Sequence, residues 1–577
     1  MTTSLLRTRH WLHNFVAGAC LLALALPALA QARPDPALPP PALDVRLTPH
    51  ARDGEVVRMD VELRIEHPDV AAGAALLRMP TLLVSTPTAA YAASQISASD
   101  AKGPLILRSE EEPETPTGNY RRYLTDRATT GDVVVRYATP PRAVDASTRN
   151  GPLFDLRRQP HGIMGAGVYF LALPDTTTPY RIGLRWDLSG MPAGSIGVWS
   201  LGEGEQHTVA PVEVLRFSYY AAGPLQRRSG QGHGKFAMYW LGKPPFEMSR
   251  LAEQTESVYR YMTHFFGADD APYRVFARGN PYPAGGGTGL ASSFMFGYGP
   301  GGETIAQGPQ MLLAHEMAHN WPKLDDEEHA LTAWYTEGTA EFYSIVLSQR
   351  AGVFGLDAFV DQLNDRASGY YANPHRALSN AEAGKLFWKD ARAQRVPYGR
   401  GFMYLVGVDS QVRARSGGKR SLDDLVLEVL RRQRAGDKVG VADWRALVVG
   451  ELGAAAGVAF DRMVAGDTLA PEPTAFGCLR AIAVRERPFD LGFDEMRLGQ
   501  VNDLREGSAA AAAGLHDGDA IVSSTPLPTL KGDPRRHMQM QVRRDGKLLT
   551  FDYLPRGAEI DAWHWQRDPD SQAGCTP

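Results

Sequence analysis

Hydrophobic and polar residues alternate without a break along "VRMDVELRI" at residues 57–65. An alternation of period two is typical of a strand with one buried and one exposed face. The segments "DVVVRY" (132–137) and "YRIGLRWDL" (180–188) have a similar pattern, and turns rich in Pro, Gly and Asp separate them. We therefore predict an all-β domain over residues 31–228, with a structural or substrate-orienting role.

The spacing of apolar residues then becomes helical. Four of them follow one face of a helix: Leu251, Val258, Met262 and Phe265. Most of the chain that follows has this character, so we predict a second domain, largely helical, over residues 229–469.

A linker and a third domain are predicted for the end of the chain. The segment "APEPTAFG" (470–477) has the composition of a linker, and we assign residues 470–577 to the third domain. Cys478 and Cys575 lie near the two ends of this region. An even pair of cysteines in an exported protein is a candidate disulfide, although the sequence does not establish that the two are bonded.

Residues 1–30 are expected to be a signal peptide. Arg7 and Arg9 give a positive start, residues 15–26 are apolar, and the "ALA" before Gln31 is a small-x-small cleavage pattern. A membrane anchor is the alternative, but a spanning helix needs about 20 apolar residues. We expect a periplasmic or extracellular protein with no other segment that spans a membrane.

The overall charge changes this picture little. The chain has 61 Lys and Arg against 65 Asp and Glu, and loss of two arginines with the signal peptide leaves 59 against 65, a net charge of −6. No basic run stands out, which argues against a nucleic-acid binder.

The segment "AHEMAHNW" (314–321) is the first candidate for chemistry. His315 and His319 are four residues apart, so on a helix they share one face and can offer two nitrogens to one zinc ion. Glu316 points to the side of such an ion, where it can accept a proton from the attacking water. The alternative is an ordinary helix with two histidines, because zinc needs at least three protein ligands.

Glu337 is the candidate third ligand. It lies 18 positions after His319 (337 − 319 = 18), in "AWYTEGTAEFY" (333–343), whose aromatic residues predict a buried helix. A buried carboxylate needs a partner, and a metal is a suitable one. Glu341, one turn later, is a candidate for orienting a ligand. We expect one Zn²⁺ per chain, held by His315, His319 and Glu337.

The pair "HEMAH" and "WYTEG" resembles the gluzincin zinc metallopeptidases, relatives of aminopeptidase N. The segment "VPYGRGF" (396–402) is similar to the family segment with the tyrosine that stabilises the oxyanion, which implies that role for Tyr398. The segment "GGKRSLDDLVLEVL" (417–430) resembles one branch, the glycyl aminopeptidase family. This resemblance implies a multidomain fold with an N-terminal all-β domain, a thermolysin-like α+β and helical catalytic domain, and a C-terminal PDZ domain.

The last domain resembles a PDZ domain in two segments. These are "GSAAAAAGLHDGDAIVSS" (507–524) and "DLGF" (490–493), the latter similar to a carboxylate-binding loop. Such a domain binds the C-terminus of a peptide as an added strand. The alternative is a domain that only packs against the catalytic unit.

The sequence departs from the family at one position. The segment "GTGLASS" (287–293) lies where the relatives have the glutamate that binds the substrate amine, and Ala291 occupies that position (315 − 291 = 24). Gly289, Leu290 and Ala291 are the candidate substrate-binding residues. An alanine cannot pair with an ammonium group, although Glu303 or Glu341 could replace the missing anchor.

We therefore predict an exported zinc metallopeptidase that acts on peptides or proteins, with Glu316 and Tyr398 as catalytic residues. The alternatives are an aminopeptidase with a replaced amine anchor, a hydrolase of another amide or ester, and a non-catalytic PDZ-type binding protein. The side-chain specificity, the oligomeric state and the choice between exo- and endopeptidase stay open.

Overall fold

The computed structural model describes residues 39–571 and residue 575. Within this range it leaves out residues 85, 116–117, 146–147, 149–151, 230–234, 269–271, 282–285, 301–308, 327, 388–389 and 496–497. The expected signal peptide and Glu303 lie outside the described residues. Among the helices that are described, none has both the length and the apolar character needed to cross a membrane.

The N-terminal part is rich in β structure, as predicted. Its strands are β1 (Ala42–Arg52), β2 (Glu55–Ile65), β3 (Ala75–Leu83), β4 (Thr86–Pro87), β5 (Ser97–Asp100), β6 (Gly103–Leu105), β7 (Leu107–Glu111), β8 (Gly118–Thr125), β9 (Val133–Thr139), β10 (Arg157–Gln159), β11 (Gly162–Ala166), β12 (Leu173–Pro174), β13 (Tyr180–Trp186), β14 (Ile196–Trp199), β15 (Gly202–Glu203), β16 (Gln206–Ala210) and β17 (Tyr219–Gly223). Short helices η1 (Ala93–Gln95), α1 (Gly167–Phe170) and α2 (Glu213–Arg216) interrupt them.

These strands form three sheets. Their orders are β16-β13-β1-β2-β9-β5-β6, β10-β11-β17-β14-β15, and β12-β3-β8-β7 with β4 paired to β3. The strand β2 lies in the middle of the first sheet, and its alternation places one face in the core, where these residues are at most 1% exposed: Met59, Val61, Leu63 and Ile65.

The middle of the chain forms one sheet and a group of helices. The strands are β18 (Gln226–Ser229), β19 (Phe236–Trp240), β20 (Tyr273–Gly279), β21 (Gly286–Leu290) and β22 (Ser293–Tyr298). The helices are α3 (Met248–Phe265), α4 (Pro309–Ala318), α5 (His329–Arg350), α6 (Leu356–Ala372), α7 (Asn380–Leu386), α8 (Ala391–Gln394), α9 (Val396–Ser416), α10 (Leu422–Arg434), α11 (Val441–Leu452) and α12 (Ala454–Ala465). We call this part the helical domain and its sheet the central sheet.

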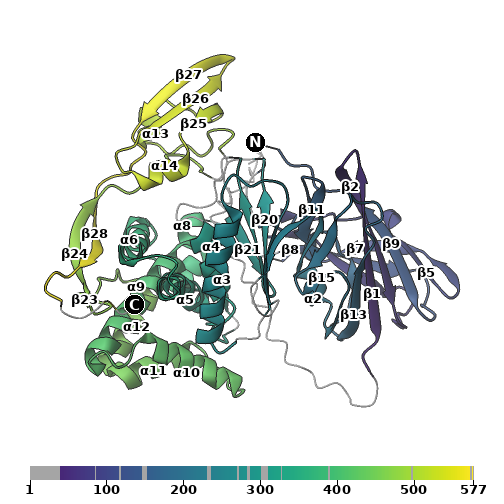
Figure 1. The fold of residues 1–577 in the computed structure, drawn as a ribbon, viewed down its shortest axis with the longest axis horizontal. Helices are drawn as coiled ribbons and strands as arrows, with labels where there is room; N and C mark the ends of the chain where they lie inside the picture. Colours follow the sequence, from purple (N-terminus) through teal and green to yellow (C-terminus); the bar gives the residue numbers. More distant parts are fainter. Residues whose placement is uncertain are drawn as a thin grey trace, which may run out of the picture.

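The central sheet lies between the β domain and the helices (Figure 1). Its order is β18-β19-β20-β22-β21, with β19, β20 and β22 parallel and β21 antiparallel at one edge. The strand β18, at the end of the predicted β domain, pairs with β19 and so belongs to this sheet. Helices α3 and α4 lie on the side of the sheet that faces the other helices (Figure 1).

The end of the chain is divided between two cores. Strands β23 (Thr474–Ala475), β24 (Leu479–Glu486) and β28 (Ile560–Arg567) form a sheet on α6, and their residues Leu479, Ala562 and Trp565 join the core of the helical domain. Between β24 and β28, the chain forms a module with its own small core, which includes Leu491 and Phe493.

We call residues 487–557 the C-terminal module. It contains α13 (Ala509–Ala512), β25 (Ala520–Ser524), α14 (Leu527–Gly532), β26 (Met538–Arg544) and β27 (Lys547–Tyr553), and the three strands form one sheet. Within the predicted range 470–577, the flanking strands β23, β24 and β28 pack on the helical domain, and the C-terminal module has its own core.

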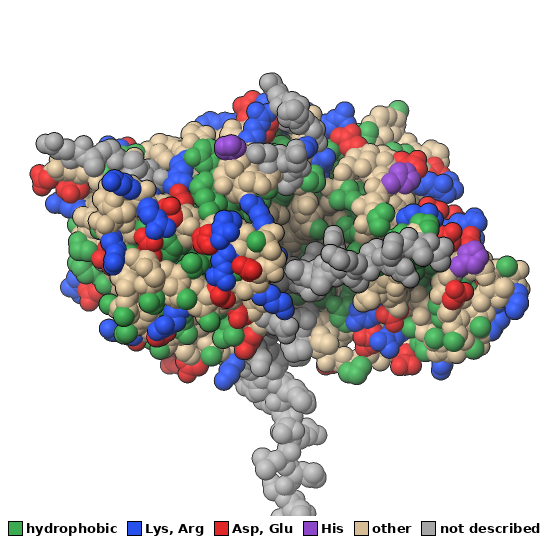
Figure 2. Space-filling view, turned by 90° about the horizontal axis from the view of Figure 1, so that it is seen from below, with side chains coloured by type: hydrophobic (Ala, Val, Ile, Leu, Met, Phe, Trp, Pro, Cys, Tyr) green, Lys and Arg blue, Asp and Glu red, His purple; other side chains and the backbone are tan. Residues whose placement is uncertain are grey.

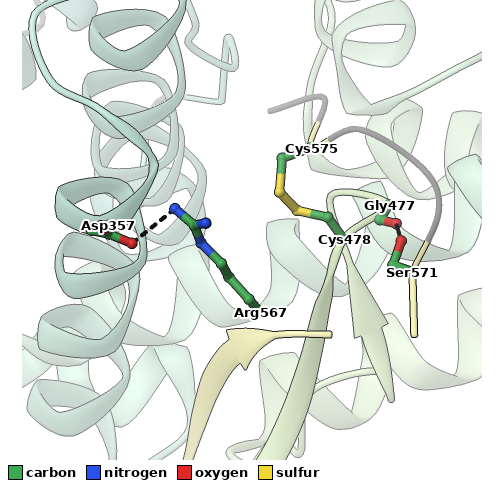
Figure 3. The surroundings of a disulfide bond; sticks show 6 residues. All are labelled: Asp357, Gly477, Cys478, Arg567, Ser571 and Cys575. Atoms are coloured by element: carbon green, nitrogen blue, oxygen red, sulfur yellow. Dashed lines mark hydrogen bonds and ion pairs between the residues drawn. A yellow bond between two sulfur atoms is a disulfide. The ribbon is translucent and has the colours of Figure 1, made fainter. Parts of the chain in front are cut away.

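Cys478 and Cys575 form a disulfide across a sequence separation of 97 residues. Figure 3 shows the bond beside two further contacts of the same region. Ser571 donates to the Gly477 carbonyl, and Arg567 pairs with Asp357 of α6 at 2.8 Å. These contacts fasten the end of the described chain to the helical domain.

Acidic and basic side chains are intermixed on the face of the molecule shown in Figure 2. The described side chains of this face therefore give no extended surface of one charge, which is consistent with the formal net charge of −4 for the whole sequence.

Candidate metal centre

Helices α4 and α5 bring the three predicted ligands together. His315 lies in the last turn of α4, His319 follows its final residue, and Glu337 lies in α5, which packs against α4. The Nε2 atoms of the two histidines are 3.1 Å apart. The Oε2 atom of Glu337 is 3.5 Å from Nε2 of His315 and 3.4 Å from Nε2 of His319. Three ligand atoms thus form a nearly equilateral triangle.

Two sides of this triangle have the length expected in a zinc site, and the side between the histidines is slightly shorter. Two ligand atoms about 2.0–2.2 Å from zinc, separated by the tetrahedral angle, are about 3.3–3.6 Å apart. The side chains of all three residues are at most 7% exposed. Two imidazole nitrogens and a carboxylate oxygen are also the donor types that zinc prefers. The residues present therefore fit the ion.

Hydrogen bonding supports the same assignment. Within the described part of the chain, two buried carboxylate oxygens accept no hydrogen bond. They are Oε2 of Glu337 and Oε1 of Glu316. A buried polar atom without a partner is costly, so each such atom needs an explanation. A cation bound between the histidines and Glu337 would be the missing partner of the Glu337 oxygen.

Glu316 lies beside the triangle rather than in it. One of its carboxylate oxygens is within 4.8 Å of a ring nitrogen of each histidine. On its other side is the backbone of Gly289, where a Cβ added to the glycine would be 3.1 Å from Oε2 of Glu316. A glycine at that position therefore leaves room for the carboxylate.

The two buried carboxylates of the site have opposite protonation tendencies. Burial raises the pKa of Glu316 to about 8, with Glu337 and Glu341 adding to the rise while His319 opposes it. Burial also opposes ionisation of Glu337, but its contacts with His319 and His315 lower its pKa to about 2. Paired carboxylates with separated pKa values are typical of acid–base sites. Glu337 therefore has the properties of a charged metal ligand, and Glu316 has those of a group that exchanges a proton.

Glu341 lies behind His315. Its Oε1 atom is 3.5 Å from Nδ1 of His315, and its Oε2 atom accepts a hydrogen bond from Nε of Arg366 at 2.8 Å. The structure therefore places Glu341 where it can orient a ligand, with one of its oxygens held by Arg366. Arg366 was not predicted from the sequence, because a polar residue in an amphipathic helix carries no signal of its own.

Helix α9 brings Tyr398 to the site. Its ring is stacked on that of His315, with centroids 5.9 Å apart and an angle of 9° between the planes. Tyr398 is the third residue of α9, and Pro397 before it occupies a first-turn position that favours helix initiation. The predicted catalytic tyrosine thus lies next to the predicted metal ligands.

Strand β21 carries the three candidate substrate-binding residues along the edge of the central sheet. Gly289 and Leu290 are half-buried in β21, and Ala291 begins the two-residue turn into β22. The second turn residue, Ser292, has a left-handed φ of 48°. Ala291 therefore lies at the end of the strand whose Gly289 contacts Glu316.

The β domain holds this strand in place. Tyr219 of β17 donates to the Thr288 carbonyl at 2.9 Å, and the Leu153 amide donates to the Thr288 hydroxyl at 2.9 Å. Ser200 donates to Ser293 at 2.7 Å. These contacts give the β domain a role beside the site, and no local pattern in the sequence pointed to these residues.

Comparisons with known proteins address the fold. No model of a protein family and no curated protein matches the chain. Among solved structures, an aminopeptidase N family protein from Idiomarina loihiensis is 14% identical with a TM-score of 0.61, and the match covers 93% of this chain and 100% of that one. This likeness shows that the two chains share a fold.

Two further structures are more distantly similar. An M1 zinc metallopeptidase from Deinococcus radiodurans is 16% identical, with a TM-score of 0.43 and coverage of 75% of this chain and 96% of that one. Leukotriene A4 hydrolase from Saccharomyces cerevisiae is 13% identical, with a TM-score of 0.43. The match covers 76% of this chain and 69% of that one. TM-scores this low carry no argument about this chain.

Proposed function

We propose that this protein is a zinc-dependent metallopeptidase. The observation that carries the proposal is the triangle of His315 Nε2, His319 Nε2 and Glu337 Oε2, with sides of 3.1, 3.4 and 3.5 Å. Glu316 lies beside this triangle, so the site has three protein ligands. Structural zinc sites use four, and a three-ligand site therefore supports catalysis.

Each residue has a separate role in this proposal. Bound zinc would polarise the scissile carbonyl and lower the pKa of the attacking water. Glu316 accepts the proton of that water and passes it to the leaving amine. Tyr398 donates its hydroxyl proton as a hydrogen bond to the developing oxyanion.

The edge strand β21 suits a peptide substrate. It pairs with β22 on one side and packs against α4 on another. An extended peptide can bind such an edge as an added strand. We propose that the substrate lies along Gly289 and Leu290, with its scissile bond next to Glu316.

The specificity is proposed to differ from that of the glycyl aminopeptidases, which the sequence resembles. Ala291 has no charge, and the Ser293 hydroxyl beside it is already bonded to the Ala291 carbonyl and to Ser200. Glu341 is engaged by Arg366. These contacts support relaxed or endopeptidase activity over recognition of a free amine.

Export to the periplasm or the extracellular space is also part of the proposal. Its support is the signal-like pattern of residues 1–30 and the disulfide between Cys478 and Cys575. Disulfides persist in oxidising compartments and are rare in the cytosol of most organisms.

The C-terminal module is proposed to be PDZ-like, and its contacts favour packing over capture of a peptide. Described residues between 491 and 499 form no strand that a peptide could extend. Glu495, which lies in this stretch, pairs with Lys531 at 2.9 Å. It is also 3.7 Å from Arg395, which precedes α9. The contact with Arg395 joins the module to the helical domain, which supports packing.

One experiment separates a peptidase from a non-catalytic binding protein. The purified protein and Glu316→Gln are compared for zinc content and for cleavage of a mixed peptide library, with product ends identified by mass spectrometry. We expect near-stoichiometric zinc in both proteins and cleavage only by the wild type, because an amide cannot accept the proton. Zinc in both proteins without cleavage by either would contradict the proposal.

A further inference from the structure

We propose that Arg366 is a positioning residue for the metal ligand His315 and acts through Glu341. This inference rests on the proposed function, because it assigns Arg366 a role in holding zinc. The relevant chain of contacts runs from α6 through α5 to α4, and each step is a contact between buried or nearly buried side chains.

Arg366 fixes one oxygen of Glu341 and leaves the other to His315. The guanidinium Nε donates to Oε2 of Glu341 at 2.8 Å, while Oε1 lies 3.5 Å from Nδ1 of His315. The side chains are 9%, 16% and 6% exposed for Arg366, Glu341 and His315. A carboxylate held by one oxygen cannot rotate freely, so its second oxygen stays directed at the imidazole.

The direction of Oε1 decides which nitrogen of His315 faces the metal. An acceptor at Nδ1 favours the tautomer with hydrogen on Nδ1 and a free lone pair on Nε2. Nε2 is the atom that lies 3.1 Å from His319 and 3.5 Å from Glu337. Arg366 therefore stabilises the tautomer and ring orientation that metal binding requires.

Arg366 is itself held from two directions. Its Nη1 donates to Oε1 of Gln362 one turn earlier at 2.7 Å. Helix α6 is fastened to β28 because Asn364 donates to the Trp565 carbonyl at 2.9 Å and accepts from the Trp565 amide at 2.7 Å. The arginine thus has a defined position before any metal binds.

Two other roles for Arg366 predict different results. If it only balanced charge, its removal would make the site more negative and hold a cation more tightly. If it only stabilised the fold, its removal would lower the melting temperature and leave zinc release unchanged. Of the three roles, only positioning of His315 predicts that the folded variant releases zinc faster.

The test compares zinc release from holoprotein into excess chromogenic chelator, with the melting temperature of each variant. The variants are Arg366→Gln, Arg366→Lys and, as a matched control, Arg413→Gln. Arg413 forms a similarly shielded pair with Asp409 at 2.6 Å, in α9, with side chains 14% and 1% exposed. It has no place in the candidate site.

We expect Arg366→Gln to release zinc about 10–100 times faster than the wild type, the usual effect of losing an outer-shell partner. Arg366→Lys, which keeps a donor and a charge, should release it at an intermediate rate. Arg413→Gln should melt at a lower temperature but release zinc at the wild-type rate.

Equal or slower release from folded Arg366→Gln would overturn the inference. If that variant does not fold, Arg366→Lys decides, and a wild-type rate in it would overturn the inference. A wild-type protein that holds no zinc would instead overturn the proposed function, so the two failures are distinguishable.

Discussion

Gly338 of α5 and Gly401 of α9 meet backbone to backbone. A Cβ on Gly338 would lie 2.5 Å from the carbonyl carbon of Gly401, and a Cβ on Gly401 would lie 1.9 Å from the carbonyl oxygen of Trp334. Real Cβ atoms do not approach backbone atoms so closely, so any larger residue forces the helices apart. Gly338 follows the ligand Glu337, and Gly401 is three residues after Tyr398. The glycine contact therefore sets the distance between the tyrosine and the metal site.

Replacing Gly401 should damage both stability and turnover. We expect Gly401→Ala to lower the free energy of unfolding by roughly 1–3 kcal/mol, the usual cost of overpacking, and to lower kcat because Tyr398 moves from the site. Zinc content should stay near the wild-type value. Chemical denaturation, peptide cleavage and elemental analysis measure the three effects.

Gly407 in the same helix is the matched control for Gly401. No heavy atom lies within 4 Å of a Cβ built at Gly407. Gly407→Ala should therefore raise stability by up to about 1 kcal/mol, because alanine is the better helix former, without a change in kcat. Equal effects of the two substitutions would rule out the proposed helix contact.

The junction between the β domain and the central sheet should depend on Asp155. This fully buried carboxylate lies 2.8 Å from Arg157, 3.1 Å from Arg142 and 3.1 Å from Arg278 of β20. Loss of its charge leaves three guanidinium groups without this partner, so Asp155→Asn should cost about 3–5 kcal/mol of stability. Denaturant unfolding measures this cost. As a control, Asp561→Asn should change stability by less than about 0.5 kcal/mol, because the Asp561 side chain is 94% exposed.

Asp155 should also contribute to acid sensitivity. Burial opposes its ionisation, but Arg157 and Arg278 outweigh this and lower its pKa to about 2. In the unfolded chain, an aspartate has a pKa of about 3.9. Its contribution of roughly 2–3 kcal/mol is therefore present above pH ~4 and is lost as the pH falls towards 2. Asp155→Asn should remove this part of the pH dependence, and an unchanged acid unfolding curve would contradict the assignment.

Local spacing was sufficient to predict the centre of the site. Four-residue spacing on a helix placed His315 and His319 together, and the buried setting of Glu337 pointed to a third ligand. The structure brings these residues to within 3.5 Å of one another. The proximity of the two histidines could be predicted because helix geometry fixes neighbours three and four residues apart.

Contacts between distant segments could not be predicted in the same way. Arg366 reaches Glu341 only through the packing of α6 on α5, and Tyr219 reaches Thr288 only through the docking of two domains. The pairing of strands at the end of the chain is a further example. Strand β24 pairs with β28, about eighty residues later, so Leu479 pairs with Arg567. The residues of neither strand indicate which other strand it pairs with.

The Cys478–Cys575 disulfide should account for a measurable part of the stability. It closes a loop of 97 residues, for which the chain-entropy model gives up to ~4–5 kcal/mol. We expect no free thiol in denatured, unreduced mature protein. Reduction should lower the denaturation midpoint, and the double variant Cys478→Ser/Cys575→Ser should not respond to reductant. Two titratable thiols in the unreduced protein would refute the bond in solution.

The last prediction concerns the amino end of the substrate. A free ammonium group gains little from Ala291, which has no charge, because burying an unpaired charge is unfavourable. We therefore expect a peptide with an acetylated N-terminus to be cleaved with a kcat/KM within about tenfold of that for the matched free peptide, a difference of ~1.4 kcal/mol.

A gain-of-function variant makes this prediction sharper. Ala291 begins the turn at the end of β21, two residues beyond the Gly289 that contacts Glu316, and its side chain is partly exposed. A carboxylate at this position can pair with the substrate amine, so Ala291→Glu should favour the free peptide over the acetylated one by more than about tenfold. The preference should disappear at pH values above the pKa of the peptide amine, about 7.7–8.0, where the amine is neutral. A wild-type protein that already prefers the free peptide by more than tenfold would show that another group anchors the amine.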